Sequence, residues 1–159
     1  MEFFQDHMPG NICFGCGAEN SEGLKIKSYW QGDEACCEWL PQSKYQGWTG
    51  LLNGGIMATL IDCHCMGTAI AHAYRAEDRS MGSEPEYRYA TGTMEIKYLK
   101  PTSSRIPVLL KARVTASTAK KTVMTCDFYS DGQKTAEAQV IAIKVYDSSQ
   151  HYENNQFDT

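Results

Sequence analysis

The fold of this chain is set by the stretch Gly50-Leu-Leu-Asn-Gly-Gly-Ile-Met-Ala-Thr-Leu-Ile-Asp-Cys-His-Cys-Met-Gly-Thr-Ala-Ile-Ala-His-Ala73. Apolar residues recur in it at spacings of three and four, the period of an α-helix. The stretch holds no proline, lysine or arginine. Apolar side chains lie around most of the helix that it predicts, so we expect this helix to be buried on nearly every side. Its one acidic residue is Asp62. A buried carboxylate is costly unless it is paired or serves chemistry, so Asp62 is the first candidate functional residue.

Size and composition are those of one globular domain. The chain has 159 residues, of which 42% are hydrophobic and 21% charged. We expect one domain over residues 1–146 and a polar tail over 147–159. A formal charge of −4, with no run of more than two lysines or arginines, argues against nucleic-acid binding. The first residues lack a signal-peptide pattern, and Asp62 and His64 interrupt the longest apolar stretch, so we expect no membrane span.

The seven cysteines show no regular spacing, which is typical of reduced thiols in the cytoplasm. Cys13 and Cys16 form a Cys-x-x-Cys pair that could be half of a zinc site, with His7 as a third ligand. Tetrahedral zinc takes about four ligands, and a second pair is missing. The adjacent Cys36 and Cys37 would point to opposite faces of a strand. We therefore expect a glycine-rich entry loop with two buried thiols and no metal.

Alternating apolar and polar residues on both sides of the predicted helix indicate strands. The predicted strands cover residues 24–30, 34–40, 87–98, 107–118, 122–130 and 135–146. In the strand 87–98 we expect one face to carry Thr91, Thr93, Glu95 and Lys97, and the other Met94, Ile96 and Tyr98. One helix against an antiparallel sheet is an α+β arrangement. Two copies that pair edge to edge would cover the open edge strands, so we expect a homodimer at least.

Two motifs resemble a known family. The run Gly-x-x-x-Gly-Gly-Ile-x-Ala-x-Leu-x-Asp at residues 50–62 is followed by Thr91-Gly-Thr-Met-Glu-Ile-Lys-Tyr-Leu-Lys-Pro101. Together they resemble hotdog-fold acyl-CoA thioesterases of the PaaI-type and 4-hydroxybenzoyl-CoA thioesterase-like branch. The Cys-x-x-Cys-Gly segment, Asn20 and Gly23-Leu24 resemble a bacterial subset of that branch. The resemblance covers residues 13–146. It implies a hotdog fold, in which an antiparallel sheet wraps around one long helix, and a homodimer that pairs further into a dimer of dimers.

The resemblance also implies roles for four residues. Asp62 would activate a water molecule against the thioester carbonyl, or attack that carbonyl itself. The N–H of Gly54, at the positive end of the helix, would stabilise the oxyanion, and Thr91 would hold the attacking water. Asn53 stands where the family usually has histidine, and its amide can still donate a hydrogen bond to a carbonyl oxygen. Because the sites of this family straddle the dimer, Asp62 and Thr91 would act with Asn53 and Gly54 of the other subunit.

The substrate implied by the resemblance is a thioester of coenzyme A, with no separate cofactor. Residues that would contact its CoA portion are Gly55, Lys97, Lys100, Arg105, Lys120 and Lys121. Two departures from the family pattern keep a second hypothesis open. Asn53 cannot titrate as histidine does, and Gly47 stands where the family often has asparagine or glutamine. These changes favour a module that binds acyl-CoA without cleaving it.

Overall fold

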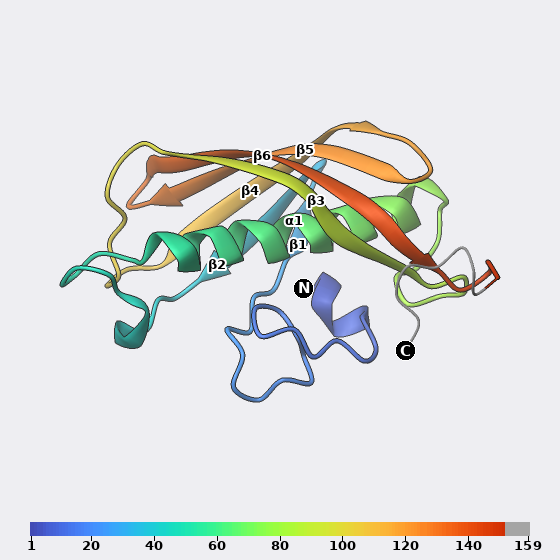
Figure 1. Ribbon diagram of the computed structural model, residues 1–159, viewed down its shortest axis with the longest axis horizontal. Coiled ribbons are helices and arrows are strands. Elements are labelled where there is room, and N and C mark those ends of the chain that lie inside the picture. Colours follow the sequence, from blue (N-terminus) through green and yellow to red (C-terminus); the bar gives the residue numbers. More distant parts are fainter. Residues whose placement is uncertain (152–159) are drawn as a thin grey trace.

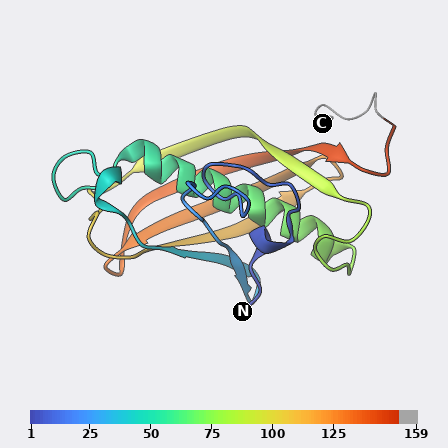
Figure 2. The same ribbon diagram turned by 90° about the horizontal axis from the view of Figure 1, so that it is seen from below.

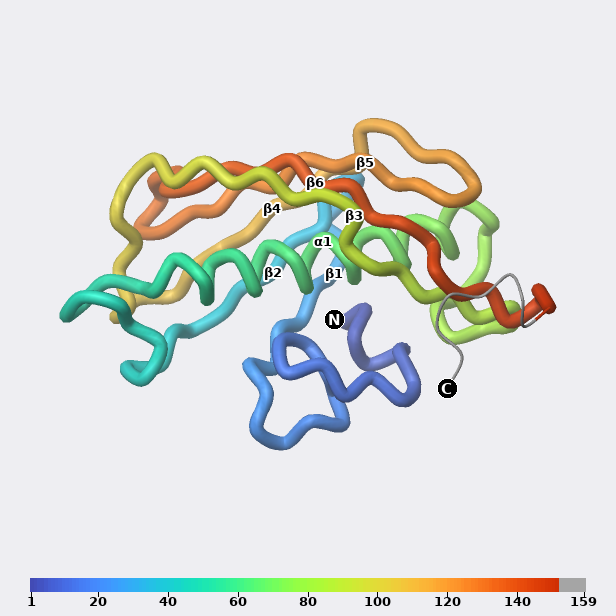
Figure 3. The backbone as a smooth tube through the Cα atoms, viewed as in Figure 1, coloured from blue at the N-terminus to red at the C-terminus, as the bar shows by residue number. Residues whose placement is uncertain are grey.

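The computed structural model describes residues 1–151, which form one antiparallel sheet and one long helix (Figure 1). Its elements are η1 (Phe4–His7), β1 (Tyr29–Gln31), β2 (Glu34–Trp39), η2 (Ser43–Tyr45), α1 (Gly54–Ala76), β3 (Tyr87–Tyr98), β4 (Val108–Ser117), β5 (Lys121–Ser130) and β6 (Gln133–Asp147). The sheet has six strands in the order β1-β2-β4-β5-β6-β3, and all neighbours are antiparallel. It curves over α1, as the tube in Figure 3 also shows. This is the hotdog arrangement that the resemblance implies.

Helix α1 begins at a side-chain cap. The Asn53 Oδ1 atom accepts hydrogen bonds from the N–H groups of Gly55 and Ile56, at 2.8 and 3.2 Å. These bonds satisfy two of the backbone donors that the first helical turn leaves without a partner. By length and apolar composition α1 would also suit a membrane span, but 56% of its most apolar window is buried inside the protein. It is the core helix of this fold.

Only part of the circumference of α1 packs against the sheet. Leu60, Ile61 and Cys65 are fully buried in the core, together with Phe128 and Val140 of the sheet. The side of α1 that carries Asp62, Met66 and Ile70 is half-buried. The expectation of a helix enclosed on nearly every side is therefore too strong. Asp62 lies on the side that the sheet leaves open.

The chain before β1 does not form the predicted strand over residues 24–30. Only Tyr29–Gln31 pairs with β2. The N–H groups of Leu24 and Ile26 instead donate to the carbonyls of Phe14 and Gly15, at 2.7 and 3.1 Å. The backbone of this segment is therefore paired with the N-terminal loop and not with the sheet. Figures 1 and 2 show that this loop lies on the side of α1 away from the sheet.

A buried polar network fixes the N-terminal segment to α1. The His64 Nδ1 atom lies 2.8 Å from the Ser28 Oγ atom, and its Nε2 atom lies 3.2 Å from the carbonyl oxygen of Ala35. The Gln5 Oε1 atom accepts from the N–H of Ser28 at 2.7 Å. Burial lowers the pKa of His64 to about 4, so the imidazole is neutral at pH 7. These bonds hold η1 and the loop after it against the open side of the helix.

Strand β3 is an edge strand with a bulge at Gly92. Thr91 lies opposite Ala142 of β6, and Thr93 lies opposite the next residue, Ile141, so Gly92 is the extra residue. A Cβ atom on Gly92 would lie 2.9 Å from a side-chain atom of Ile143. Only glycine therefore fits at the bulge without a shift of its neighbours.

The bulge changes which face of β3 carries Thr91. The Thr91 hydroxyl bonds to α1, and Met94 and Ile96 pack against the core beneath the same helix. The prediction that Thr91 shares a face with Thr93, Glu95 and Lys97 is therefore wrong, because one extra residue reverses the alternation of side chains.

The predicted polar tail over 147–159 falls largely outside the described residues. Within them, β6 extends through Asp147, and the Ser148 N–H donates to the carbonyl of Glu86.

Candidate active site

Asp62 and Thr91 meet where α1 passes β3. The Thr91 hydroxyl donates a hydrogen bond to the Asp62 Oδ1 atom. Helix α1 supplies the carboxylate from its open side, and the bulge at Gly92 turns Thr91 toward it. Asp62 is therefore half-buried, and its carboxylate is paired with a hydroxyl. The sequence had instead predicted a carboxylate surrounded by apolar side chains. A carboxylate oriented by a hydroxyl can serve as a general base or a nucleophile.

The pair lies in the wall of a cavity of about 480 Å³. The walls come from the N-terminal loop, the open side of α1 and the first half of β3. Apolar lining residues include Met8, Ile12, Met66, Ile70, Tyr87 and Tyr89. A mostly apolar cavity of this size with a few polar groups is typical of a small-molecule site. The arrangement can enclose a small or medium apolar group and place a carboxylate beside it.

The start of α1 forms a second group of predicted site residues. Asn53 uses its Oδ1 atom to cap the helix, so the Gly55 N–H is engaged within the chain. No described residue accepts a hydrogen bond from the N–H of Gly54. The Tyr98 hydroxyl donates to the Gly54 carbonyl at 2.7 Å and so fixes the backbone there. The Gly54 N–H is therefore a free donor at the positive end of the helix dipole, where negative charge is stabilised.

The four predicted catalytic residues fall into these two groups. Asp62 and Thr91 are in contact, and Asn53 and Gly54 are neighbours at the helix start. Asp62 lies eight positions after Gly54 on the helix, which corresponds to about 12 Å along the axis. A single chain therefore does not bring the Gly54 N–H and the Asp62 carboxylate to one carbonyl group.

The residues predicted to contact CoA are also divided. Gly55 and Lys100 lie near the helix start, and Lys100 Nζ donates to Gln133 Oε1 at 3.2 Å. Lys120 lies in the turn before β5 and Lys121 is the first residue of β5, at the other end of the sheet. Strand β6 shows the separation, because Ala136 is opposite Tyr98 while Ile143 is opposite Lys121. Seven strand residues span about 23 Å.

Lys97 lies apart from both groups. It is exposed on β3 beside a cleft that it shares with the acidic residues Glu95, Asp127 and Glu137. Arg105 is exposed close to the helix start, with its guanidinium about 3.3 Å from where a Gly50 Cβ would stand. Within one chain the predicted basic residues therefore do not form one phosphate site.

Two residues of this region escaped sequence reasoning, Tyr98 and Cys63. Tyr98 lies on the helix-facing side of β3, a position that its alternation with Met94 and Ile96 indicates. Cys63 follows Asp62 on α1, and its Sγ atom lies 3.8 Å from that of Cys13. No local pattern links two cysteines that are 50 positions apart.

Cys63 changes the electrostatics of the Cys-x-x-Cys loop. Its thiol hydrogen bond, with the N–H groups of Cys16 and Gly15, lowers the pKa of Cys13 to about 5 despite partial burial. The bonds to Cys13 and Cys16 and its own burial raise the pKa of Cys63. The loop was expected to hold two buried thiols, but Cys13 is exposed and Cys16 half-buried. The proposed third ligand, His7, instead lies 3.0 Å from the Glu2 carboxylate.

A sequence profile of the Thioesterase superfamily matches residues 49–137, more than half of the chain, and spans both Asp62 and Thr91. The chain belongs to the thioesterase superfamily. It is therefore a thioester hydrolase with a hotdog fold. A search of curated proteins finds no significant match.

Solved structures agree with this membership. A thioesterase superfamily protein from Shewanella loihica is 29% identical, with a TM-score of 0.62 over 76% of this chain and 91% of that one. The Escherichia coli PaaI protein, from the phenylacetic acid degradation operon, has a TM-score of 0.64 at 11% identity over 80% and 84%. A thioesterase from Haemophilus influenzae has a TM-score of 0.64 at 15% identity over 86% and 89%. The last two similarities show that this thioesterase shares their fold.

Proposed function

We propose that this thioesterase hydrolyses coenzyme A thioesters of small or medium acyl or aryl groups. The observation that carries the proposal is the Asp62–Thr91 pair in the wall of a largely apolar cavity. A thioester bound with its acyl group in this cavity presents its carbonyl carbon to the carboxylate. The apolar side chains of the cavity would cover the bound acyl group.

In the proposed mechanism the carboxylate of Asp62 removes a proton from a water molecule that attacks the carbonyl. The Thr91 hydroxyl holds one carboxylate oxygen, Oδ1, so that Oδ2 is available to the water. The tetrahedral intermediate then collapses and releases the thiolate of CoA. If Asp62 instead attacks the carbonyl directly, the thiolate of CoA leaves and a mixed anhydride of Asp62 and the acyl group forms. When water attacks the Asp62 carbon of that anhydride, a single turnover in ¹⁸O-labelled water places the label in Asp62 and leaves the first acid released unlabelled.

The oxyanion donor in this proposal is the Gly54 N–H of a second copy, assisted by the Asn53 amide. The separation of about 12 Å along α1 rules out a contribution from the same chain to one carbonyl. A second copy fits along β3, whose outer edge has no neighbouring strand among residues 1–151. Near the helix start, apolar side chains are exposed on the same side, with Trp48 84% and Tyr98 52% exposed. We propose a homodimer through this edge, which pairs further as a dimer of dimers.

The CoA portion would lie near the helix start. Lys100 and Arg105 place positive charge there, beside the cleft that Trp48 and Tyr98 line. Contacts to CoA from another subunit are proposed for Lys97, Lys120 and Lys121. A backbone contact to CoA is proposed for Gly55. All seven cysteines are free thiols, which supports a reducing compartment, and we propose the cytoplasm. The hydrolysis needs no group beyond the CoA that is part of the substrate.

The test is a panel of acyl- and aryl-CoA thioesters, with release of free CoA as the readout. Wild-type protein should hydrolyse members with small or medium groups. Asp62→Asn should lower kcat by about 10²–10⁴-fold, because the amide cannot accept the proton. Asp33→Asn, at an exposed turn carboxylate, is the matched control and should keep full activity. Full activity of Asp62→Asn, or CoA binding without turnover across the panel, would contradict the proposal.

A further inference from the structure

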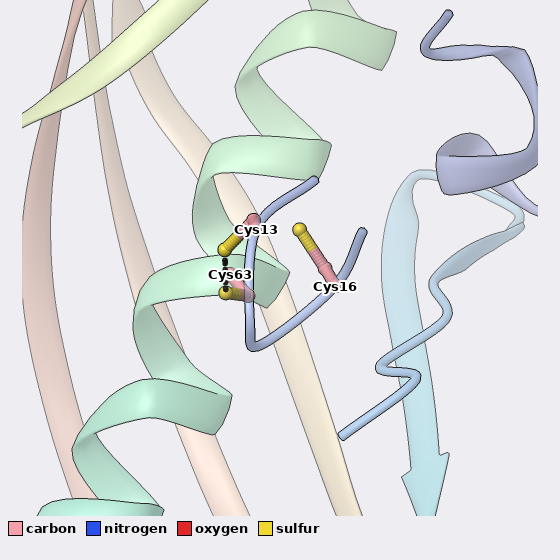
Figure 4. Close-up of side chains that lie close together, drawn as sticks. All are labelled: Cys13, Cys16 and Cys63. Carbon is pink, nitrogen blue, oxygen red and sulfur yellow. Dashed lines mark hydrogen bonds between the residues drawn. The ribbon is translucent and has the colours of Figure 1, made fainter. Parts of the chain in front are cut away.

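Three cysteine thiols converge where the N-terminal loop meets α1 (Figure 4), and all three residues line the cavity. The Sγ atoms of Cys13, Cys16 and Cys63 all lie within 4.8 Å of one another. In tetrahedral zinc sites the Zn–S distance of about 2.3 Å places sulfur atoms about 3.8 Å apart. The Cys13 and Cys63 sulfurs already have this separation, 3.8 Å. Among the residues that the structure describes, this is the one cluster of three or more histidine, cysteine or carboxylate side chains close enough to share a metal ion.

The loop that carries Cys13 and Cys16 is shaped around the sulfur atoms. The N–H of Gly15 donates to Cys13 Sγ at 3.4 Å, and the Asn11 amide donates to Cys16 Sγ at 3.5 Å. Such bonds stabilise thiolates, because they place positive dipole ends at the sulfur. The cluster therefore has outer hydrogen bonds of the kind that orient metal ligands.

Glycines let this loop approach α1 closely. A Cβ atom on Gly15 would lie 2.4 Å from Cys63 Sγ, so any larger residue would push the loop away from the helix. A Cβ atom on Gly17 would lie 2.5 Å from the backbone nitrogen of Cys13. Both contacts are impossible for real Cβ atoms. The close approach of the three sulfurs thus depends on glycine at two positions of the Cys-x-x-Cys-Gly segment.

We propose that Cys13, Cys16 and Cys63 bind one Zn²⁺ ion as thiolates. Three sulfur ligands select a soft or borderline ion, and zinc accepts the distorted tetrahedral geometry without a redox change. On binding, the thiols that are still protonated release their protons to solvent. A disulfide would use two of the three sulfurs and leave the third without a role. The fourth ligand is a water molecule from the cavity, which all three cysteines line.

The ion would fasten one wall of the cavity to the helix. The N-terminal loop carries Met8 and Ile12 against the cavity, while Cys63 is the residue after Asp62 on α1. A bond through the metal therefore ties the loop to the helix turn that carries the catalytic carboxylate. This role goes beyond hydrolysis and holds whichever thioester is cleaved.

The test begins with the unmodified protein. Protein treated with a chelator and kept under reductant is titrated with Zn²⁺ against a chromophoric zinc chelator. We expect one ion per chain, bound tightly enough to compete with the chelator. Titration with Co²⁺ should give the intense near-ultraviolet absorption of thiolate-to-metal charge transfer. Uptake of less than about a tenth of an ion per chain would overturn the proposal.

Single variants then assign the ligands. Cys63→Ser should abolish stoichiometric zinc binding and the Co²⁺ charge-transfer band, while Cys36→Ser, on β2, should keep both. Circular dichroism confirms that each variant is folded. Zinc binding that persists unchanged in Cys63→Ser would overturn the assignment, as would a disulfide that re-forms in place of zinc uptake after reduction. None of these readouts depends on thioesterase activity, so they separate this proposal from the proposed function.

Discussion

At the scale of single residues, the proposed hydrolysis depends on the Asp62 carboxylate and the hydroxyl that orients it. The Thr91 hydroxyl donates to Asp62 and the bulge at Gly92 directs it there. Sequence resemblance indicates both residues, but not the contact between them, because that contact requires α1 to lie beside β3. The contact between Asp62 and Thr91 is consequently an observation of the structure, beyond the resemblance, that supports hydrolysis.

We predict that Thr91→Val lowers kcat by about 10–100-fold with little change in KM. The methyl group replaces the hydroxyl at nearly equal volume, and a hydrogen bond to a charged group contributes about 1.5–3 kcal/mol. Steady-state kinetics on the best substrate of the panel measure the effect. Thr91→Ser keeps the hydroxyl and should retain most activity. An equal loss of kcat in the valine and serine variants would show that the Thr91 hydroxyl does not contribute to hydrolysis.

In the proposed mechanism, Asn53 takes the place of the usual histidine at the start of α1. Its Oδ1 atom caps the helix through Gly55 and Ile56, and its Nδ2 group retains two N–H donors for a carbonyl oxygen. The Gly54 N–H is left free beside it. The departure from the family pattern therefore preserves donors at the place where negative charge would develop.

We predict that Gly54→Pro abolishes most activity while Gly54→Ala keeps it. Proline suits the first position of a helix and removes only the N–H. Asn53, with φ −62° and ψ 133°, already has the conformation that a following proline requires. An alanine Cβ would meet the Tyr98 ring at an ordinary 3.5 Å. Loss of one oxyanion donor costs about 10²–10³ in kcat. Equal activity of the two variants, both folded by circular dichroism, would refute this role of the N–H.

At the scale of elements, the bulge in β3 decides which residues face the cavity. Strict alternation along residues 87–98 predicts Thr91 on the wrong face, whereas the structure inserts Gly92 as an extra residue. A glycine within a strand is a known sign of a bulge, so the sequence carried the signal. What it could not show is the position of the bulge relative to Asp62.

Gly92→Ala should lower the free energy of unfolding by about 1–3 kcal/mol and reduce hydrolysis. The new Cβ would lie 2.9 Å from the Ile143 side chain and 3.1 Å from the carbonyl oxygen of Ile141. The strand must shift, and Thr91 moves away from Asp62. Urea unfolding and kinetics measure both effects. Thr125→Ala, at an exposed position on β5, serves as the control. A Gly92→Ala protein with normal stability and activity would contradict the tight fit at the bulge.

Local periodicity predicts the long helix and most strands, because those elements use their own repeating pattern. Residues 24–28 alternate like a strand, yet their backbone donors are satisfied by Phe14 and Gly15 of the N-terminal loop. Likewise, Cys63 meets Cys13 only because that loop crosses α1. Contacts between segments far apart in the sequence depend on tertiary packing, which periodicity does not report.

At the scale of the whole molecule, the proposed mechanism needs two copies of the chain. Asp62 faces the cavity, whereas the Gly54 N–H lies at the start of α1, about 12 Å away along the helix axis. The free edge of β3 and the exposed side chains of Trp48 and Tyr98 indicate where a second copy would pair. Light scattering should therefore give a mass of two or four times 17.8 kDa. A monomer that retains full activity would contradict the shared site.

The activity of mixed dimers tests whether Asp62 of one chain acts with the Gly54 N–H of the other. Chains with Asp62→Asn and chains with Gly54→Pro are co-expressed with different tags, and dimers that carry both are isolated. Each variant alone should be nearly inactive. In the mixed dimer one of the two sites receives an intact Asp62 from one chain and an intact Gly54 N–H from the other. We predict about half of the wild-type kcat per dimer. If the mixed dimer is as inactive as its parents, Asp62 of one chain and the Gly54 N–H of the other do not form one site.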